Sequence, residues 1–509
     1  MRVFHDLINN LHNKYKMHHS FLAVAILILL GIFFRIWRYA INRSLWLDEA
    51  LLALNITDRS FGELREPLSY NQGSPIGFLF IEKLIIEIIG NKDFILRLFP
   101  FIAGIFTIFL MYIVAKRYLV RLGYITPLAL IAISPQLIHY SSDVKQYSTD
   151  VLVTLLLLYI GYIGLESKKN YKYFIILAIS GIFAMWFSHP ALFILGGIVI
   201  SLTINFLFDR DSNKLKWLIS IIFLWLLNFY ALYYISLRSL ASNTYLINYW
   251  KSGFIPLPPW KDAIWFYEIF TEFLKHPVEL PIVPLTTILL FLGCLSIILR
   301  KWQLAIILIL PFPSILIASG VEKYPFKGRM VLFLLPIVFL LVGEGIERIR
   351  TFLNGRHPII GYLTWAILFF SLLLHPFKTT FQYFNHPPIV EDIKPMMLYL
   401  STHRLITDQI YVYYAAAPAF KYYAESYGFR DADYIVGIIS RENPDEYLRD
   451  IDRFFGEDRM WFVFTHNCSW CNVNEKDFIK EFLDRSGSVL YEYNSIDASL
   501  YLYDLHHQQ

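Results

Sequence analysis

Two adjacent carboxylates near the start of the chain are the first groups that could do chemistry. Asp48 and Glu49 lie in the run RSLWLDEA, which begins at Arg43 and follows an apolar stretch. A carboxylate held near a membrane surface can accept a proton from a polar substrate, which is the role of a general base. Adjacent acids are also common in solvated loops and as helix caps. The pair therefore needs partners elsewhere in the sequence before it indicates a site.

A second polar segment joins two apolar runs farther along the chain. It reads YSSDVKQY and places Asp143, Lys145 and Tyr147 close together. Ammonium and phenol groups donate hydrogen bonds to phosphate oxygens and sugar hydroxyls. A capped, solvated turn between two helices is the plainer interpretation of the same residues. Other polar turns that we expect on the same side of the membrane strengthen the interpretation of this segment as a binding site.

Two further turns carry His189 and Arg329. Arg329 ends the run YPFKGR, and its guanidinium can pair with the phosphate of a lipid. Gly328 beside it lets the chain approach closely, whereas snorkelling to the interface is the alternative for Lys327 and Arg329. His189, in the run WFSHP, is more typical of capping or packing than of a metal ligand or a base.

The elements that must position these groups are membrane helices. The 509 residues are 56% hydrophobic and 17% charged, whereas soluble domains carry about 25% charged residues. The mean hydropathy is +0.47. The formal net charge of +4 gives no support for nucleic-acid binding. We therefore expect a polytopic α-helical membrane protein surrounded by membrane lipids.

The apolar runs predict about eleven transmembrane helices. A bilayer core about 30 Å thick needs roughly 20 mostly apolar residues per helix. The first run starts at Phe21 and has no small-residue cleavage site after it, so we expect it to be retained. The other runs are 96–115, 124–140, 150–165, 171–187, 190–208, 216–237, 281–299, 302–319, 329–346 and 358–375.

The segment 74–90 is apolar but contains Glu82, Lys83 and Glu87. Each charge costs about 2.5–3.5 kcal/mol at a helix centre, so we expect an interfacial helix. Five connections on one side then carry 14 Lys or Arg, whereas the short opposite loops around 141–147, 188–190 and 320–329 carry 4. The positive-inside rule places the N-terminus in the cytoplasm and the C-terminus outside the cell membrane. The acidic pair and the polar turns fall on the outside.

The chain is predicted to have two domains. Residues 1–380 form a transmembrane domain with external loops at 40–73 and 238–280, and 384–509 form a small extracytoplasmic α/β domain. Mixed polar and β-like patterns predict the second domain. Its expected helices are 389–403 and 475–485, and its expected strands are 409–414, 460–464, 488–493 and 498–504.

Cys468 and Cys471 form a CxxC pair in the second domain, close to His466. A structural zinc site takes four protein ligands, and the chain has no second cysteine pair. A local disulfide is therefore favoured over a metal or a redox motif, and no residue is assigned to a metal.

In this order, the motifs resemble the membrane-embedded C-type glycosyltransferases. The branch is the family 39-like one that contains protein O-mannosyltransferases and bacterial lipid A aminoarabinose transferases. The resemblance covers roughly residues 20–375, and the external domain extends it to nearly the whole chain. The segments that carry it are LWLDEA at 45–50, SPIGFL at 74–79, FILRLFP at 94–100 and YSSDVKQY at 140–147.

The resemblance implies transfer of a hexosyl or pentosyl group from a polyprenyl-phosphate donor, with inversion, on the extracytoplasmic face. Asp48 matches the catalytic acid and would act as general base. Glu49 would orient the acceptor or a neighbouring cation. Lys145 and Arg329 would offset charge on the departing phosphate. Asp143, Tyr147 and His189 are the other expected substrate-binding residues, and the acceptor is a protein, a lipid or a glycan.

One segment departs from the resemblance. The aminoarabinose transferases have a run similar to Glu-Lys-Pro-Pro before the amphipathic helix, with the Lys near the donor phosphate. Here Gln72-Gly73-Ser74-Pro75 occupies that stretch. The departure puts in doubt a phosphate site built the same way, with Lys145 and Arg329 as the substitutes. It also puts in doubt any metal bound through that Glu. A divalent metal is left open, and no cofactor is assigned.

Two other functions fit parts of the pattern. A transporter would have many helices, but transporters usually show paired repeats and charges near the bilayer midplane. A non-catalytic subunit that binds polyprenyl lipids could retain the acidic pair. Trp250, Trp260 and Trp265 could stack on sugar rings, although anchoring of the 238–280 loop at the interface is the favoured interpretation.

Overall fold

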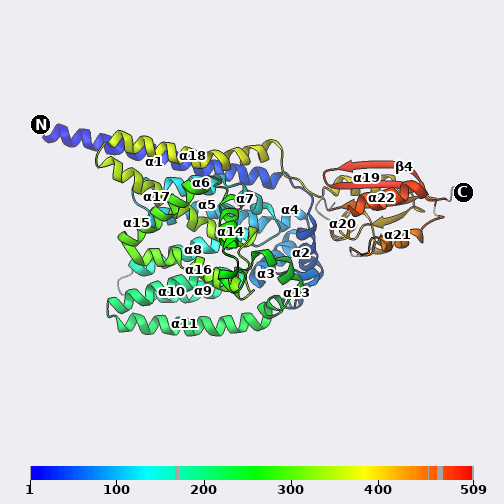
Figure 1. Ribbon diagram of the computed structural model, residues 1–509, viewed down its shortest axis with the longest axis horizontal. Coiled ribbons are helices and arrows are strands. Elements are labelled where there is room, and N and C mark those ends of the chain that lie inside the picture. The colour runs from blue at the N-terminus through cyan, green and yellow to red at the C-terminus, as the bar shows by residue number, and fades with distance from the viewer. Residues whose placement is uncertain (1, 167–170, 442, 457, 467–473, 507–509) are drawn as a thin grey trace. The chain divides into compact units, whose positions relative to one another are not determined.

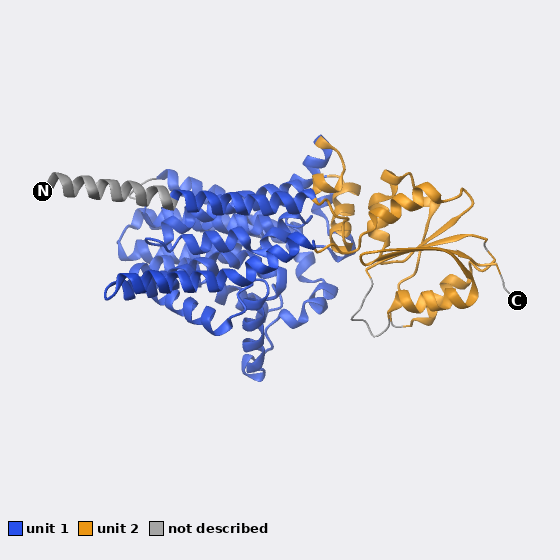
Figure 2. Ribbon diagram, turned by 90° about the horizontal axis from the view of Figure 1, so that it is seen from above, with its two compact units in different colours: residues 1–40, 61–88, 97–387 blue, residues 41–60, 89–96, 388–509 orange. Residues whose placement is uncertain are grey.

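A computed structural model describes residues 2–166, 171–441, 443–456, 458–466 and 474–506. The chain divides into two compact units (Figures 1 and 2). Unit 1 comprises Met1–Ala40, Phe61–Ile88 and Arg97–Pro387, and unit 2 comprises Ile41–Ser60, Ile89–Leu96 and Pro388–Gln509. Each unit is described by itself.

The described residues of unit 1 form helices joined by loops, and each apolar run predicted from the sequence lies largely in one or two of these helices. Its helices are α1 Arg2–Ala40, α3 Ile76–Ile89, α5 Leu98–Tyr118, α6 Ile125–Ile133, α7 Pro135–His139, α8 Tyr147–Glu166, α9 Tyr171–Phe187, α10 Ala191–Phe208, α11 Ser212–Leu232, α12 Arg238–Ala241, α13 Thr244–Tyr249, α14 Ala263–Lys275, α15 Val283–Ile309, α16 Pro311–Gly320, α17 Leu335–Asn354 and α18 Pro358–Asn385.

Eight helical stretches of the described residues are long and apolar enough to cross a membrane, and α9 is a shorter apolar helix of the same kind. The predicted class, a polytopic α-helical membrane protein, is confirmed. The predicted number of about eleven crossings stays a prediction. At 14 residues, α3 is about 21 Å long and too short to span the bilayer core by itself.

One predicted boundary differs from the structure, and another coincides with a break between helices. The run 124–140 is broken at Ser134, because its side chain caps α7 by accepting a hydrogen bond from the Leu137 N–H at 3.4 Å, with Pro135 at the first helical position. The predicted turn at 300–301 falls at a break between two helices, where the backbone is non-helical at Lys301. A polar residue therefore marks the break in each of these two stretches.

Helix α17 is the centre of unit 1 and is almost completely buried in its apolar part. It packs against α15 through two glycines, Gly293 and Gly345. A Cβ at either position would collide with a carbonyl of the facing helix, at Leu341 or Leu289. Small residues bring membrane helices into close contact in this way. The tight core gives the polar turns a rigid base.

Unit 2 contains a five-stranded sheet with the order β2-β1-β3-β5-β4. Strand β1 is parallel to both its neighbours, whereas β5 is antiparallel to β3 and β4. Helices lie on both faces of the sheet (Figure 2). The elements are α2 Leu47–Asp58, α4 Asp93–Leu96, α19 Lys394–His403, β1 Gln409–Val412, α20 Ala417–Ala424, β2 Ile435–Val436, α21 Asp445–Asp452, β3 Met460–Thr465, α22 Glu475–Ser486, β4 Ser488–Ser495 and β5 Ala498–Asp504.

The small α/β domain predicted near the C-terminus is therefore present, with all four expected strands. The sequence did not predict β2, α20 or α21. It also assigned residues 41–60 to the membrane domain, whereas here they form part of unit 2, where α2 packs against α20. The helix that carries the acidic pair thus contacts the C-terminal domain.

Candidate active site

The acidic pair lies in the first turn of α2 in unit 2. Leu47 is the first residue of this helix, and Asp48 and Glu49 follow it directly. The N-terminal turn of a helix favours negative charge, because its unpaired N–H groups carry a partial positive charge. Asp48 is half-buried, and Glu49 is fully buried. The two acids therefore differ in their exposure to solvent although they are neighbours in sequence.

Glu49 is paired with Arg43. The Arg43 Nη1 donates a hydrogen bond to Glu49 Oε2 at 2.5 Å, and both side chains are buried. A charge-assisted bond of this kind is strong, and its loss would leave a buried charge. Glu49 therefore stabilises the turn on which Asp48 sits.

The start of α2 is held by residues more than 300 positions away in the sequence. The Leu47 N–H donates to Glu391 Oε2 at 2.6 Å, and the Leu45 N–H donates to the Tyr423 hydroxyl at 2.9 Å. The other oxygen of Glu391 lies 2.6 Å from Nδ1 of His466. None of these three partners was predicted, because no local pattern marks a contact over such a separation.

The charge of His466 is set mainly by Glu391. The hydrogen bond to Glu391 raises the pKa of His466 above its ordinary value, and attraction to Glu391 and Asp497 acts in the same direction. Burial and the nearby Arg441 oppose this shift of the His466 pKa. The imidazole therefore keeps its positive charge to higher pH than an exposed histidine.

In unit 1, the Lys145 side chain extends to the segment Gln72-Gly73-Ser74-Pro75, where the sequence departs from the resemblance. Its Nζ donates a hydrogen bond to Oε1 of Gln72 at 2.7 Å, and the side chain is almost completely buried. Next to it, the Ser74 hydroxyl donates to Oε1 of Gln146 at 3.3 Å. The Lys145 ammonium thus lies against the stretch in which the aminoarabinose transferases carry their lysine.

Tyr147 and Arg329 come from distant parts of unit 1 and lie together. The Arg329 guanidinium carbon is 5.8 Å from the centroid of the Tyr147 ring and 5.7 Å from that of Trp250. Both distances suit a cation–π interaction. Gly328 has φ +53, a left-handed conformation that glycine adopts without strain and that turns the chain ahead of Arg329. Two predicted residues and one of the three predicted tryptophans are therefore neighbours.

Asp143 and His189 lie in two different turns of unit 1. Asp143 is fully buried, and its Oδ2 lies 3.7 Å from Nε2 of His139, whose Nδ1 is 3.1 Å from Nη2 of Arg38. His189 belongs to the turn between α9 and α10, and burial lowers its pKa to about 4. A histidine with that pKa is neutral at neutral pH, so it can offer a hydrogen bond but no charge.

The other two tryptophans of the long loop have different surroundings. Trp265 donates from Nε1 to the Ser252 carbonyl at 3.2 Å, and Trp260 is 81% exposed. Exposure of that degree is typical of an interfacial anchor.

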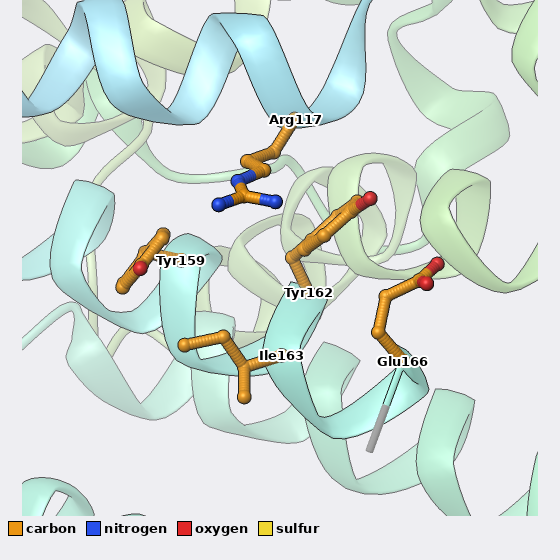
Figure 3. Close-up of a pocket in the computed structure, with 5 residues that line it drawn as sticks. All are labelled: Arg117, Tyr159, Tyr162, Ile163 and Glu166. Atoms are coloured by element: carbon orange, nitrogen blue, oxygen red, sulfur yellow. The ribbon is translucent and has the colours of Figure 1, made fainter. Parts of the chain in front are cut away.

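A cavity of about 250 Å³ lies at the far end of α8 from Tyr147. Its lining is Arg117, Tyr159, Tyr162, Ile163 and Glu166 (Figure 3). Helix α8 has 20 residues, so its two ends are about 30 Å apart. The cavity is therefore separate from the polar turn of the candidate site.

Within the described ranges, no group of three or more His, Cys, Asp or Glu side chains has a geometry that could hold a metal ion. Cys468 and Cys471 lie outside the described residues. The predicted local disulfide therefore stays a prediction, and a divalent metal stays open.

Comparison with known proteins extends these observations. The model of the family described as dolichyl-phosphate-mannose-protein mannosyltransferase matches residues 73–235. No curated protein matches the chain by sequence.

The fold resembles that of ArnT from Cupriavidus metallidurans in the apo state, with a TM-score of 0.54 and 10% identity over 96% of this chain and 98% of that one. The same enzyme bound to undecaprenyl phosphate gives a TM-score of 0.52 at 11% identity, over 95% and 98% of the two chains. The chain has the C-type glycosyltransferase fold.

A third solved structure supports this fold from another organism. The archaeal oligosaccharyltransferase AglB from Archaeoglobus fulgidus, in complex with an inhibitory peptide and a dolichol-phosphate, has a TM-score of 0.53 and 11% identity. The alignment covers 96% of this chain and 74% of AglB. The resemblance drawn from the sequence motifs, to the branch of mannosyltransferases and aminoarabinose transferases, is confirmed.

Proposed function

We propose that this protein is a glycosyltransferase that moves a sugar from a polyprenyl-phosphate donor to an acceptor outside the cytoplasm. The family match and the C-type fold support this proposal. Two of the similar structures contain undecaprenyl phosphate or a dolichol-phosphate, which are lipid phosphates of the required class. The observation that carries the proposal is the buried Lys145 ammonium bound to Gln72, because a cation lies beside the stretch where a donor-phosphate lysine is expected.

The donor phosphate would be bound by groups of unit 1. Lys145 offers an ammonium and Arg329 a guanidinium that lies near two aromatic rings. As the bond from the anomeric carbon to the phosphate oxygen breaks, its electron pair stays on the phosphate. Fixed cations stabilise that developing charge. Tyr147, Asp143 and neutral His189 complete the proposed substrate-binding set.

The acceptor would be activated by Asp48. Its carboxylate takes the proton as the acceptor oxygen attacks the anomeric carbon, and a single displacement inverts that carbon. Glu49, paired with Arg43, keeps the turn in place. The two adjacent acids therefore have different proposed roles: Asp48 accepts the proton, and Glu49 holds the turn in place.

The proposed arrangement in the cell follows the charge of the loops. The protein lies in the cell membrane with a cytoplasmic N-terminus. The transmembrane domain spans 1–380, and the 384–509 domain faces outward together with the loops 40–73 and 238–280. An acceptor protein, lipid or glycan would approach from that side.

The test is donor consumption by purified full-length protein. Synthetic polyprenyl-phosphate donors with a labelled sugar should release free polyprenyl phosphate only when an acceptor is present, while a nucleotide-linked sugar should not react. Passage of the labelled lipid across proteoliposomes with no cleavage would favour a transporter instead. Donor binding with neither cleavage nor passage would favour a non-catalytic subunit.

A further inference from the structure

The segment between α18 and α19 contacts the turn that carries the two adjacent acids. The N-terminus of a helix leaves four N–H groups without intrahelical partners, and a polar residue at the N-cap usually accepts from one of them. In α2 that position is Trp46, which makes no side-chain cap. The Leu47 N–H donates instead to Glu391 at 2.6 Å. A carboxylate 344 positions away thus caps the helix whose first turn carries Asp48.

Glu391 is fixed at both carboxylate oxygens. Oε2 accepts from the Leu47 N–H, and Oε1 lies 2.6 Å from Nδ1 of His466. Glu391 is 2% exposed, so water does not replace these partners. Rotation of the carboxylate would therefore break two contacts, which makes its position well defined.

The backbone at both residues supports a special role. Glu391 has φ +52 and His466 has φ +57, a left-handed conformation that is costly for residues with a side chain. Such conformations persist where surrounding contacts enforce them, and they gather at functional sites. Here the enforcing contact is the pair that the two residues make with each other.

Further contacts hold the turn before α2 to the same region. The Ser44 hydroxyl donates to Oδ1 of Asp392 at 2.7 Å, and Lys394 Nζ donates to the Asn42 carbonyl at 2.8 Å. The Tyr423 hydroxyl accepts a hydrogen bond from the Leu45 N–H and donates one to Oδ2 of Asp93, both at 2.9 Å. The turn is therefore attached to the C-terminal domain along its length.

We propose that Glu391 and His466 are positioning residues for Asp48, so that the C-terminal domain is required for the chemical step and not only for acceptor access. This inference rests on the proposed function. Glu391 orients the start of α2, and His466 orients Glu391. Neither group touches the substrate or carries a proton in the reaction.

The charged groups around the pair make its strength depend on pH. Asp497 and Glu391 favour the protonated form of His466, and Arg441 opposes it. The protonated ring binds Glu391 as a charged donor, so the support of Asp48 should weaken when His466 loses its proton. The wild-type kcat should therefore show an alkaline limb that belongs to His466.

The experiment compares full-length wild type with Glu391→Gln and His466→Gln in labelled-sugar transfer. Both variants should lower kcat by at least about tenfold with an unchanged KM for the donor, since a misplacement of 1 Å can cost about a hundredfold. The kcat of the double variant should fall no further than that of Glu391→Gln, because His466 acts on Asp48 only through Glu391. The alkaline limb of kcat should disappear in His466→Gln.

Two controls separate positioning from loss of folding. Glu481→Gln changes an exposed acid of α22 that pairs with Arg485, and it should match wild type. Asp408→Asn weakens the domain core away from the turn, so it reports what destabilisation alone does to kcat. If both test variants keep wild-type kcat, or lose only as much as Asp408→Asn at equal thermal stability, the inference is wrong. An inactive wild type would instead overturn the proposed function.

Discussion

The Nζ atom of Lys145 lies 2.7 Å from Oε1 of Gln72, which joins the turn after α7 to the segment before α3. The resemblance predicts a lysine in that segment, whereas this chain carries Gln72-Gly73-Ser74-Pro75. The same charge therefore reaches the same stretch from a different part of the chain. This is the physical basis for assigning the donor phosphate to Lys145.

Removal of this charge should weaken donor binding. We expect Lys145→Met to raise the KM for a polyprenyl-phosphate sugar at least about tenfold, because a hydrogen bond to a charged group contributes about 1.5–3 kcal/mol. Steady-state kinetics over donor concentration measure this. Lys323→Met, which removes an exposed lysine bound to the Ala241 carbonyl, is the matched control and should leave the KM unchanged. An unchanged KM in Lys145→Met would remove Lys145 from the donor site.

Arg329 should matter for turnover more than for binding. We expect Arg329→Ala to lower kcat by about a hundredfold, since the loss of one preorganised donor to developing charge costs about that much. Arg329→Lys should recover only part, because a lysine lacks the planar fork. Arg238→Ala is the control, as it removes a similar contact 5.9 Å from the Tyr234 ring. Equal kcat in all four proteins would show that Arg329 only anchors the loop.

The buried pair of Arg43 and Glu49 should dominate the stability of the acidic turn. We expect Glu49→Leu to lower the free energy of unfolding by about 3–5 kcal/mol, because it leaves the Arg43 charge buried without its partner. The double variant Arg43→Met with Glu49→Leu should regain most of this. Thermal unfolding in detergent measures both. A single variant as stable as wild type would mean that the pair contributes little.

Asp408 should make the C-terminal domain sensitive to acid. Burial raises the pKa of Asp408, but the hydrogen bonds from Arg459 and Trp461, both at 2.8 Å, together with that from the Leu405 N–H, outweigh it and leave the pKa below its ordinary value. The stabilisation is present above the unfolded pKa of about 3.9 and is lost as the pH falls through the folded value.

Hydrogen-exchange protection of β1 and β3 tests this in the full chain. Wild type should keep its protection from pH 7 to pH 5 and lose it in more acidic solution. Asp408→Asn should be less protected at pH 7 and should change less with acid. Identical curves for the two proteins would contradict the assignment.

The sequence predicted most of the helices because hydropathy is a local property. A run of about 20 apolar residues must leave water whatever surrounds it. The break at Ser134 was missed, since it depends on a side-chain cap. The two-residue strand β2 is too short to show an alternating pattern.

The candidate site was predicted as separate groups. Tyr147 and Arg329 were named from different turns, and the structure brings them together beside Trp250. The partners of the acidic turn, Glu391, Tyr423 and His466, were missed. The contacts of Glu391 and Tyr423 with the turn span more than 300 positions, and no periodic pattern encodes such a contact.

The central claim is that Asp48 is the general base of a lipid-phosphate glycosyltransferase. The most direct test measures transfer of labelled sugar and donor binding for wild type and Asp48→Asn in the same membranes. We predict that Asp48→Asn binds the donor as wild type does and loses turnover by at least about a hundredfold, since a general base typically contributes about 10²–10⁴-fold. Turnover equal to that of wild type would contradict it.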